Sequence, residues 1–105
     1  MLYAVFFTDD PAHAAARDRL MPEHLDFLER HAAQIRAAGP LRDTADGSAA
    51  GGLWLVEAAD AAAVAALYQA DPFWPTGLRR SIRVLEWSQV FAGGRRQARA
   101  AKPPG

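Results

Sequence analysis

The chain is predicted to fold as an α+β domain of ferredoxin-like order, an antiparallel sheet with both helices on one face. Apolar runs rich in aromatic residues alternate with alanine-rich helical stretches in the order β-α-β-β-α-β, which is the order of that arrangement. The length of 105 residues fits one domain. A hydrophobic share of 50% argues against disorder, so the domain has enough apolar side chains to form a core.

The first half of the chain is predicted to supply a strand and a long helical region. Residues 2–7 (LYAVFF) are a continuous apolar run that ends at residues 8–11 (TDDP), which predicts a strand buried on both faces. Residues 12–20 predict a first helical stretch. A second helix is predicted over residues 22–38, because proline suits the first turn and glycine then proline at residues 39–40 is typical of a helix end. The apolar side chains of this second helix recur at helical spacing, at Leu25, Leu28, Ala32 and Ile35.

The middle of the chain predicts a turn, a strand and a second helix. Residues 40–45 are a weak strand candidate, and residues 46–52 (DGSAAGG) have the composition of a turn. The apolar run over residues 53–58 (LWLVEA) predicts a strand. Asp60 is the predicted N-cap of a helix over residues 61–70, because its carboxylate can accept from the free N–H groups of the first turn.

The last strand is predicted over residues 81–91 (SIRVLEWSQVF). Its apolar positions change phase between Val84 and Leu85, which predicts a β-bulge there. Residues 92–105 contain Gly, Arg, Ala and Pro and predict a flexible C-terminal tail. The folded domain is therefore expected to span residues 1–91.

Two of the predicted strands, residues 2–7 and 53–58, are apolar on both faces, although the helices of this fold cover only one face of the sheet. An apolar face left bare would be prone to aggregate. The sequence therefore predicts a homodimer in which two sheets pack face to face, although a fifth structural element or a partner protein would cover that face equally well. The expected contributors to this surface, or to the core under the helices, are Leu2, Val5, Phe6, Trp54 and Val56.

Composition and charge exclude several classes of partner and chemistry. The formal net charge is zero, so the chain lacks the basic excess typical of proteins that bind nucleic acid or an anionic membrane. The absence of cysteine excludes disulfides, thiolate chemistry and cysteine-bound zinc. The N-terminal run lacks the features of a signal peptide, and no segment has transmembrane length, which predicts a cytoplasmic location. A small basic cluster near the end is interpreted as part of a solvated tail, at Arg95, Arg96, Arg99 and Lys102.

Few side chains are candidates for chemistry. The sequence contains no phosphate-binding glycine loop and no dinucleotide fingerprint. His24 and His31 are two helical turns apart, too far to chelate one metal ion easily, so no metal and no cofactor are expected. His24 lies on the flank of the apolar stripe, where its ring can reach the sheet while its tip stays near water. A histidine that only completes a hydrogen bond fits the same pattern, for His24 and His31 alike, and His13 is interpreted as a surface residue.

The stretch QADPFWPTGL, residues 69–78, combines an acid and turn residues with two large aromatic side chains. An Asp71-Pro72 pair is ordinary punctuation at the end of a helix. Phe73 and Trp74 are too apolar for a simple surface turn, however, and a carboxylate packed against buried rings is costly unless it has a partner. A histidine cation is one such partner. Asp71 therefore has two interpretations, a helix-stop residue or one half of an ionic pair.

Two segments of the chain together resemble the YCII-related family. MPEHLDFLERHAAQIRAAGPL resembles the family's helix, with a Pro-x-His-Leu start and an Ala-Gly-Pro end. ADPFWPTGL resembles its second block, an Asp-Pro-aromatic segment followed by Gly-Leu and a last strand that ends in a Val-Phe pair, here Val90-Phe91. The likeness covers residues 1–91 with the blocks in the right order. It implies the fold of the dimeric α+β barrel superfamily, which agrees with the two-faced strands.

The same resemblance implies a site. In this family the helix histidine and the aspartate of the Asp-Pro block are regarded as a catalytic pair, and the matching residues are His24 and Asp71. Asp71 would then orient the imidazole of His24 and stabilise its cation, while Phe73 and Trp74 help to wall an apolar pocket. At least one branch of the family is implicated in the dehydrochlorination of a hydroxylated ring, so acid–base elimination is the reaction that the resemblance favours.

The chain departs from the family in one place. Many members carry an arginine directly ahead of the helix proline, where this chain has Met21. Arg17 and Arg19 are the candidates to take over an anion-binding role.

Three functions are therefore open. The first is a small cofactor-free enzyme that performs acid–base chemistry (elimination, isomerisation or hydrolysis) on a small, ring-bearing metabolite. The second is a non-catalytic domain that binds a small molecule in the same pocket. The third is a cofactor-free monooxygenase or a haem-binding relative on the same barrel. Its only support is the superfamily and three tryptophans that fit core packing better, at Trp54, Trp74 and Trp87. His24 and Asp71 are predicted to lie within hydrogen-bonding distance beside the main cavity, and the case for an enzyme depends on this pair.

Overall fold

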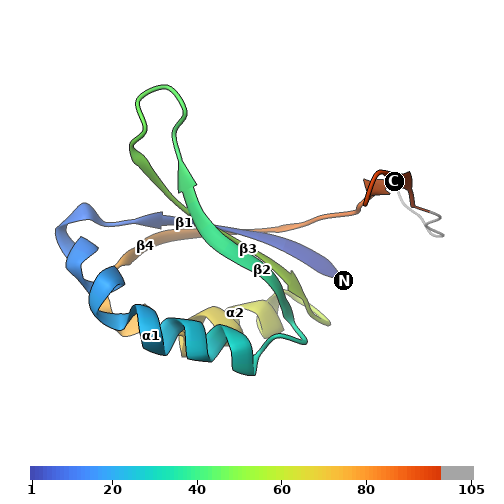
Figure 1. Cartoon of the computed structure of the whole chain (residues 1–105). Coiled ribbons are helices and arrows are strands. Elements are labelled where there is room, and N and C mark those ends of the chain that lie inside the picture. Colours follow the sequence, from blue (N-terminus) through green and yellow to red (C-terminus); the bar gives the residue numbers. More distant parts are fainter. Residues whose placement is uncertain (98–105) are drawn as a thin grey trace.

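The computed structural model describes residues 1–97 and shows a four-stranded antiparallel sheet with both long helices on one of its faces (Figure 1). The strand order is β2-β3-β1-β4, so the first strand is central and pairs with β3 and β4. This confirms the predicted α+β fold of ferredoxin-like order. The elements are β1 (Leu2–Asp9), η1 (Pro11–His13), α1 (Ala14–Arg30), β2 (Ile35–Arg42), β3 (Ala49–Glu57), α2 (Ala61–Ala70), η2 (Trp74–Thr76), β4 (Arg79–Glu86), β5 (Phe91–Ala92) and β6 (Arg95–Arg96).

Helix α1 corrects the prediction for the first helical region. It is continuous across Pro22, so the two stretches expected over residues 12–20 and 22–38 form one helix that ends at Arg30. Pro22 lies on the exposed side of α1, where the carbonyl that loses its N–H partner faces water, and this makes the proline tolerable inside the helix. After Arg30 the chain turns, and the N–H of Ile35 donates to the carbonyl of His31 at 2.8 Å.

The glycine-proline pair that was expected to end the helix lies instead in strand β2. Gly39 pairs with Leu53 and Pro40 with Gly52. Strand β2 is at the edge of the sheet, and an edge strand can accept a proline because its missing N–H need not bond a second neighbour.

The buried face of α1 also differs from the predicted stripe. Ala16, His24 and Phe27 are the buried side chains of the helix, whereas Leu25 is half exposed at 50%. Ile35 is buried, but as the first residue of β2. His24 therefore lies on the face of α1 that meets the sheet and not on its flank.

Helix α2 has the predicted bounds and the predicted cap. The side chain of Asp60 accepts a hydrogen bond from the N–H of Ala63 at 2.9 Å. At the other end, Asp71 is extended (φ −66°, ψ 137°), because the residue before a proline is disfavoured in the helical region. Asp71 is thus the point where the chain leaves the helix and returns under the sheet.

Strand β4 is shorter than predicted and carries no bulge between Val84 and Leu85. Its pairing with β1 is regular from Tyr3 opposite Glu86 to Thr8 opposite Ser81, and then shifts so that Asp9 faces Arg79. The apparent phase change has another cause. Val84 packs against the core under the helices, while Leu85 is 39% exposed on the opposite face, so both faces of this strand are apolar.

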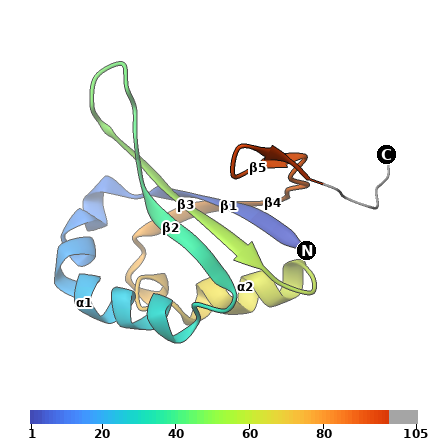
Figure 2. The same ribbon diagram turned by 45° about the vertical axis from the view of Figure 1, so that its right-hand side comes forward.

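The chain beyond β4 forms a two-stranded hairpin, β5–β6, at the far end of the sheet (Figure 2). Its hydrogen bonds from Gln97 return to residues 90–95 of the same segment. The tail expected over residues 92–105 therefore begins with a short paired segment. Residues 98–105 lie outside the described residues, and the part that this segment plays in folding stays a prediction.

The two faces of the sheet are lined differently. Tyr3, Val5 and Phe7 of β1 point to the helices with Trp54 and Val56 of β3, and all five are buried. The alternate residues of these strands lie on the open face, among them Ala4, Phe6, Leu53 and Leu55. Antiparallel pairing brings Phe6 beside Leu53 and Ala4 beside Leu55. The prediction that these strands are apolar on both faces is confirmed.

Candidate active site

Asp71 is the centre of the buried polar contacts between α2 and α1. It is 2% exposed, and its Oδ1 accepts a hydrogen bond from the N–H of Phe73 at 3.3 Å. This contact is an Asx turn, the usual way in which an aspartate before a proline closes its own loop. The backbone at the end of α2 therefore orients the carboxylate of Asp71 independently of its contacts with α1.

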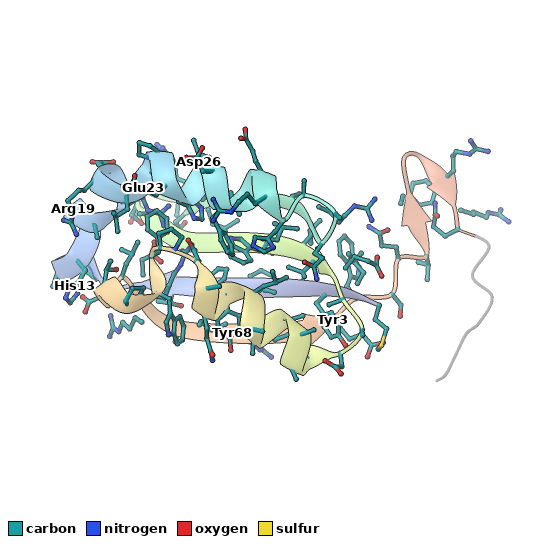
Figure 3. The ribbon with its side chains drawn as sticks, turned by 90° about the horizontal axis from the view of Figure 1, so that it is seen from below. Tyr3, His13, Arg19, Glu23, Asp26 and Tyr68 are labelled. Carbon is teal, nitrogen blue, oxygen red and sulfur yellow. The ribbon has the colours of Figure 1, made fainter. Side chains whose placement is uncertain are left out.

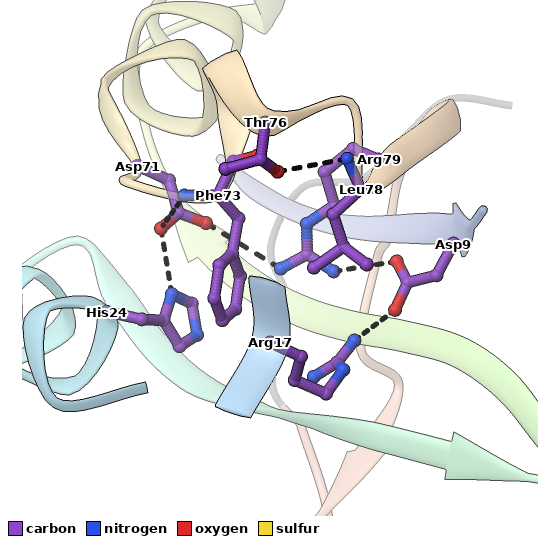
Figure 4. Close-up of polar contacts among 8 residues, drawn as sticks. All are labelled: Asp9, Arg17, His24, Asp71, Phe73, Thr76, Leu78 and Arg79. Atoms are coloured by element: carbon purple, nitrogen blue, oxygen red, sulfur yellow. Dashed lines mark hydrogen bonds and ion pairs between the residues drawn. The ribbon is translucent and has the colours of Figure 1, made fainter. Parts of the chain in front are cut away.

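His24 of α1 meets this carboxylate from the opposite side (Figure 4). The Nδ1 atom of His24 lies 2.8 Å from Oδ1 of Asp71, and the histidine is 6% exposed. A carboxylate accepts, so the neutral imidazole carries its proton on Nδ1 and leaves Nε2 as the basic nitrogen. Within residues 1–97, Nε2 has no hydrogen-bond partner. Only one side-chain nitrogen or oxygen of these residues is both fully buried and without a partner, and it is Arg79 Nε, so Nε2 of His24 is not fully buried. Nε2 is therefore accessible.

Two aromatic rings hold the imidazole in place. Phe73 stacks on His24 with ring centroids 4.2 Å apart and an interplanar angle of 21°. Trp54 of β3 lies 6.3 Å away at 30°. Because Phe73 and Trp54 are buried, the ring cannot turn away from Asp71 without disturbing the core.

Arg79, the first residue of β4, connects Asp71 to Asp9. Its Nη2 lies 3.6 Å from Oδ2 of Asp71, and its Nη1 donates to Oδ1 of Asp9 at 3.1 Å. The side chain is only 4% exposed and its guanidinium carbon lies 4.1 Å from the ring centre of Phe7. Burial lowers the pKa of Arg79, and the carboxylates of Asp9 and Asp71 oppose that shift. An arginine still keeps its charge at neutral pH, so Arg79 joins two acidic side chains from different elements.

Arg17 completes this chain of contacts from α1. Its Nη2 binds Oδ2 of Asp9, and the Arg17 side chain is 26% exposed. The polar cluster therefore runs from His24 through Asp71, Arg79 and Asp9 to Arg17 (Figure 4). It begins and ends on the same helix.

A cavity of about 110 Å³ lies between this helix and the sheet. The edge strand at residues 38–40 forms its other side, Gly52 and Trp54 of β3 line it, and Arg79 also reaches it. Its volume is of the order of the roughly 150 Å³ cavity known to hold benzene, and well below the roughly 300–1,000 Å³ of sites for drug-sized ligands. The α1 wall consists of Arg17, Met21, His24, Leu25 and Leu28.

The structure places the predicted site residues in two groups. His24 and Asp71 lie together, and His24 lines the cavity. The prediction for the aromatic pair needs correction, because neither Phe73 nor Trp74 lines this cavity. Phe73 is fully buried behind the imidazole, whereas Trp74 is 37% exposed and packs on Tyr68 at 5.3 Å. The two are adjacent at the start of a 3₁₀ turn, so their side chains leave the backbone in different directions.

The other candidates lie away from the pair. His31 packs on Phe27, with ring centroids 4.5 Å apart. His13 is exposed and lies 3.3 Å from a carboxylate oxygen of Asp10. Arg19 is exposed near the start of α1 and does not line the cavity, which leaves Arg17 as the arginine of that helix region in the site (Figure 3).

Sequence reasoning missed Asp9 and Arg79. Both lie at strand ends, where charged residues are ordinary. The signal that could have revealed them is the pairing of Asp9 with Arg79 across β1 and β4, which requires the register of the sheet. As for metal ligands, no three His, Cys, Asp or Glu side chains within residues 1–97 are grouped so as to hold an ion.

These features define a class of protein, a small α+β domain in which a buried His–Asp pair lies at a cavity between helix and sheet. The sequence model of the YCII-related domain matches residues 1–88, and the chain belongs to this family. A comparison with curated protein sequences gave no match.

A solved structure with a similar fold is that of 5-chloro-2-hydroxyhydroquinone dehydrochlorinase (TftG) from Burkholderia phenoliruptrix AC1100, in complex with 2,5-dihydroxybenzoquinone. The TM-score is 0.73 and the sequence identity 27%. The match covers 84% of this chain and 94% of the dehydrochlorinase chain. The fold and the family are thus shared with a protein that acts on a small hydroxylated ring.

Proposed function

We propose that this protein is an enzyme that performs acid–base chemistry on a small, ring-bearing, hydroxylated compound, with His24 as the catalytic base and acid and Asp71 as its positioning residue. The observation that carries the proposal is the 2.8 Å contact between His24 Nδ1 and Asp71 Oδ1, which leaves Nε2 free at the cavity. A histidine oriented in this way through a buried carboxylate is a recurrent arrangement for proton transfer.

The proposed step begins with removal of a proton from an O–H or C–H group of the substrate by Nε2. The electron pair of the broken bond stays on the substrate, where it forms a new double bond and expels a leaving group, such as a halide, together with that group's own bonding pair. The proton remains on His24 as an imidazolium until water accepts it. Asp71 stabilises this cation, and such positioned acid–base groups contribute roughly 10²–10⁴-fold to a rate.

Two observations favour a single-ring substrate. The cavity holds about 110 Å³, which is too little for a dinucleotide or a fused-ring cofactor. The dehydrochlorinase of similar fold acts on a chlorinated, hydroxylated ring. We therefore favour elimination from a substituted hydroquinone or a related ring over hydrolysis of a larger ester or amide.

We further propose that the protein acts as a homodimer joined through the open face of the sheet. Phe6, Leu85 and Trp87 are 39%, 39% and 42% exposed, and a hollow of about 320 Å³ lies among them and the leucines of β3. No helix in the described residues is long and apolar enough to cross a membrane. A second copy with the same face is the occupant that the symmetry of homo-oligomers favours.

The acid–base proposal is tested by following halide release and quinone absorbance with a panel of halogenated hydroxyhydroquinones, beginning with 5-chloro-2-hydroxyhydroquinone. His24→Gln and Asp71→Asn should each lower kcat/KM by about 10²–10⁴-fold. The side-chain amide introduced by Asp71→Asn can donate to Nδ1 and so favour the wrong tautomer, and ¹⁵N NMR of the imidazole would detect this change. His31→Gln is the matched control, because it alters a histidine of the same helix region outside the cavity, and it should remain within about twofold.

Two results would contradict the proposal. One is a His24→Gln variant that turns over the panel as fast as the wild type. The other is a wild type that accelerates no member of the panel above the rate in buffer. In that case the alternative of a non-catalytic binding domain would explain the same cavity.

A further inference from the structure

Arg17 has fewer polar partners than Arg79, the other arginine that lines the cavity. Its only polar partner among the described residues is Asp9, reached through Nη2 alone. A guanidinium has five N–H donors, so most of its donors remain for another acceptor. These unpaired donors of Arg17 are also not fully buried, because Arg79 Nε is the only side-chain nitrogen or oxygen within residues 1–97 that is both fully buried and without a partner. Arg17 thus presents unused donors at the wall that it shares with His24.

The acceptors in the cluster, in contrast, are all engaged. The two oxygens of Asp9 bind Arg79 and Arg17, and the two oxygens of Asp71 contact His24 and Arg79. Two carboxylates and two guanidinium groups balance while the imidazole is neutral. When His24 takes up a proton, the cluster carries one surplus positive charge beside the cavity. The charge that would balance it is an anion on the ligand, and it would form in the same step in which the ligand gives its proton to His24.

One aromatic ring shows how close these cationic groups are. Phe73 stacks on His24 at 4.2 Å, and the guanidinium carbon of Arg17 lies 5.6 Å from the centre of the same ring. On α1 the two residues are seven apart, two helical turns, with Met21 between them on the same wall. A single-ring ligand can therefore span from the donors of Arg17 to Nε2 of His24.

We propose that Arg17 is the anion-binding residue of the cavity, and that the site selects ring compounds with an ionised oxygen, either a phenolate or an enolate. The planar fork of a guanidinium suits such an oxyanion, and the low polarity of Met21, Leu25 and Leu28 around it strengthens the interaction. This inference rests on the proposed function, which places the substrate ring beside His24. It adds that Arg17 stabilises the negative charge that develops on the substrate oxygen. Stabilisation of that charge favours the transition state over the neutral substrate.

The test is a calorimetric titration with 2,5-dihydroxybenzoquinone, a vinylogous acid that is ionised at neutral pH, and with its uncharged analogue 2,5-dimethylbenzoquinone. The chain has no cysteine that a quinone would alkylate. Arg17→Gln should weaken binding of the ionised compound by about 10–100-fold and leave the uncharged one within about twofold. Arg17→Lys, which keeps the charge and loses the fork, should fall between. Arg19→Gln removes an exposed arginine of the same helix and should match the wild type.

Three outcomes overturn the inference. The wild type binds neither compound at millimolar concentration, or it prefers the uncharged one, or Arg17→Gln loses both compounds equally while its circular dichroism spectrum is unchanged. The result is independent of turnover. If Arg17 controls anion binding and no substrate is converted, the acid–base proposal alone fails. If turnover depends on His24 and Asp71 while Arg17→Gln binds the ionised compound as tightly as the wild type, this inference alone fails.

Discussion

Both faces of the sheet carry apolar side chains, and they differ in where charged groups are buried. The face covered by helices contains a run of charged and titratable side chains, from His24 through Asp71 and Arg79 to Asp9. The open face, in contrast, is lined by Phe6, Leu85 and other apolar side chains. Ordinary sheets of this kind bury the apolar face and hydrate the polar one.

The covered face keeps its charges because each one is paired. Arg79 and Asp71 have side-chain exposures of 4% and 2%, and isolated ions at that depth would be prohibitive. Burial of an ion pair is weak evidence for a gain in stability, since the desolvation of both ions offsets their attraction. The cluster is therefore better explained by the orientation of His24 than by a need for extra stability.

The open face requires the opposite explanation. Its exposed apolar residues cost little in a monomer, but they form one contiguous hollow instead of being scattered. The comparison between the faces therefore separates two roles. Changes on the covered face should affect stability and chemistry, and changes on the open face should affect assembly.

The largest expected effect is on the covered face. Arg79→Met leaves the buried carboxylate of Asp71 and the partly buried carboxylate of Asp9 with fewer partners, and breaking a buried ion pair in this way costs about 3–5 kcal/mol. Urea titration should therefore show a large fall in the free energy of unfolding. Arg80→Met, its exposed neighbour, is the control and should change that energy by less than about 0.5 kcal/mol.

A second variant sharpens this result. If Asp71→Asn is added to Arg79→Met, the buried carboxylate that has lost its guanidinium partner is removed, and part of the lost stability should return. A single Arg79→Met variant as stable as the Arg80→Met control would show that the ion pairs have no energetic role, and the contrast between the faces would lose its physical basis.

An intermediate effect is expected on the open face. Leu85→Lys places an ammonium group where two apolar faces are proposed to meet, and a penalty of about 2 kcal/mol would raise the dimer dissociation constant about thirtyfold. Ala66→Lys, on the exposed side of α2, adds the same charge outside the proposed interface. Sedimentation equilibrium at micromolar concentration should show a weakened dimer for the first variant only. A stable monomer in the wild type would refute the dimer outright.

The sequence predicted the fold better than the boundaries of its first helix. Helix α2 begins and ends where expected because both of its ends have local signals, the Asp60 cap and the Asp71-Pro72 pair. Pro22 was misleading, because a proline near the start of a helix and an exposed proline inside one leave the same pattern in the sequence. Gly39-Pro40 was ambiguous for the same reason, since an edge strand accepts this pair as readily as a helix end does.

The site was predictable only in part. His24 and Asp71 are 47 residues apart, and the residue patterns left both of them with ordinary structural explanations. The family resemblance connected the two residues. Arg79 could not be predicted from the sequence, because its role follows from a sheet register that places it opposite Asp9. Local sequence also could not show which of the adjacent rings, Phe73 or Trp74, turns inward.

The smallest effect is expected beyond both faces. Deletion of residues 92–105 removes the end of β5 and all of β6, whose backbone pairing is confined to the hairpin itself. The core and the polar cluster lie within residues 3–84, so thermal unfolding should shift by less than about 2 °C, which corresponds to under about 0.5 kcal/mol for a domain of this size. Differential scanning calorimetry of the wild type and the truncated chain checks this. A loss of about 5 °C or more would mean that the segment docks on folded structure. Sedimentation of the same truncated chain would then locate the contact, because docking across the open face of a second copy would weaken the dimer, whereas docking on its own sheet would not.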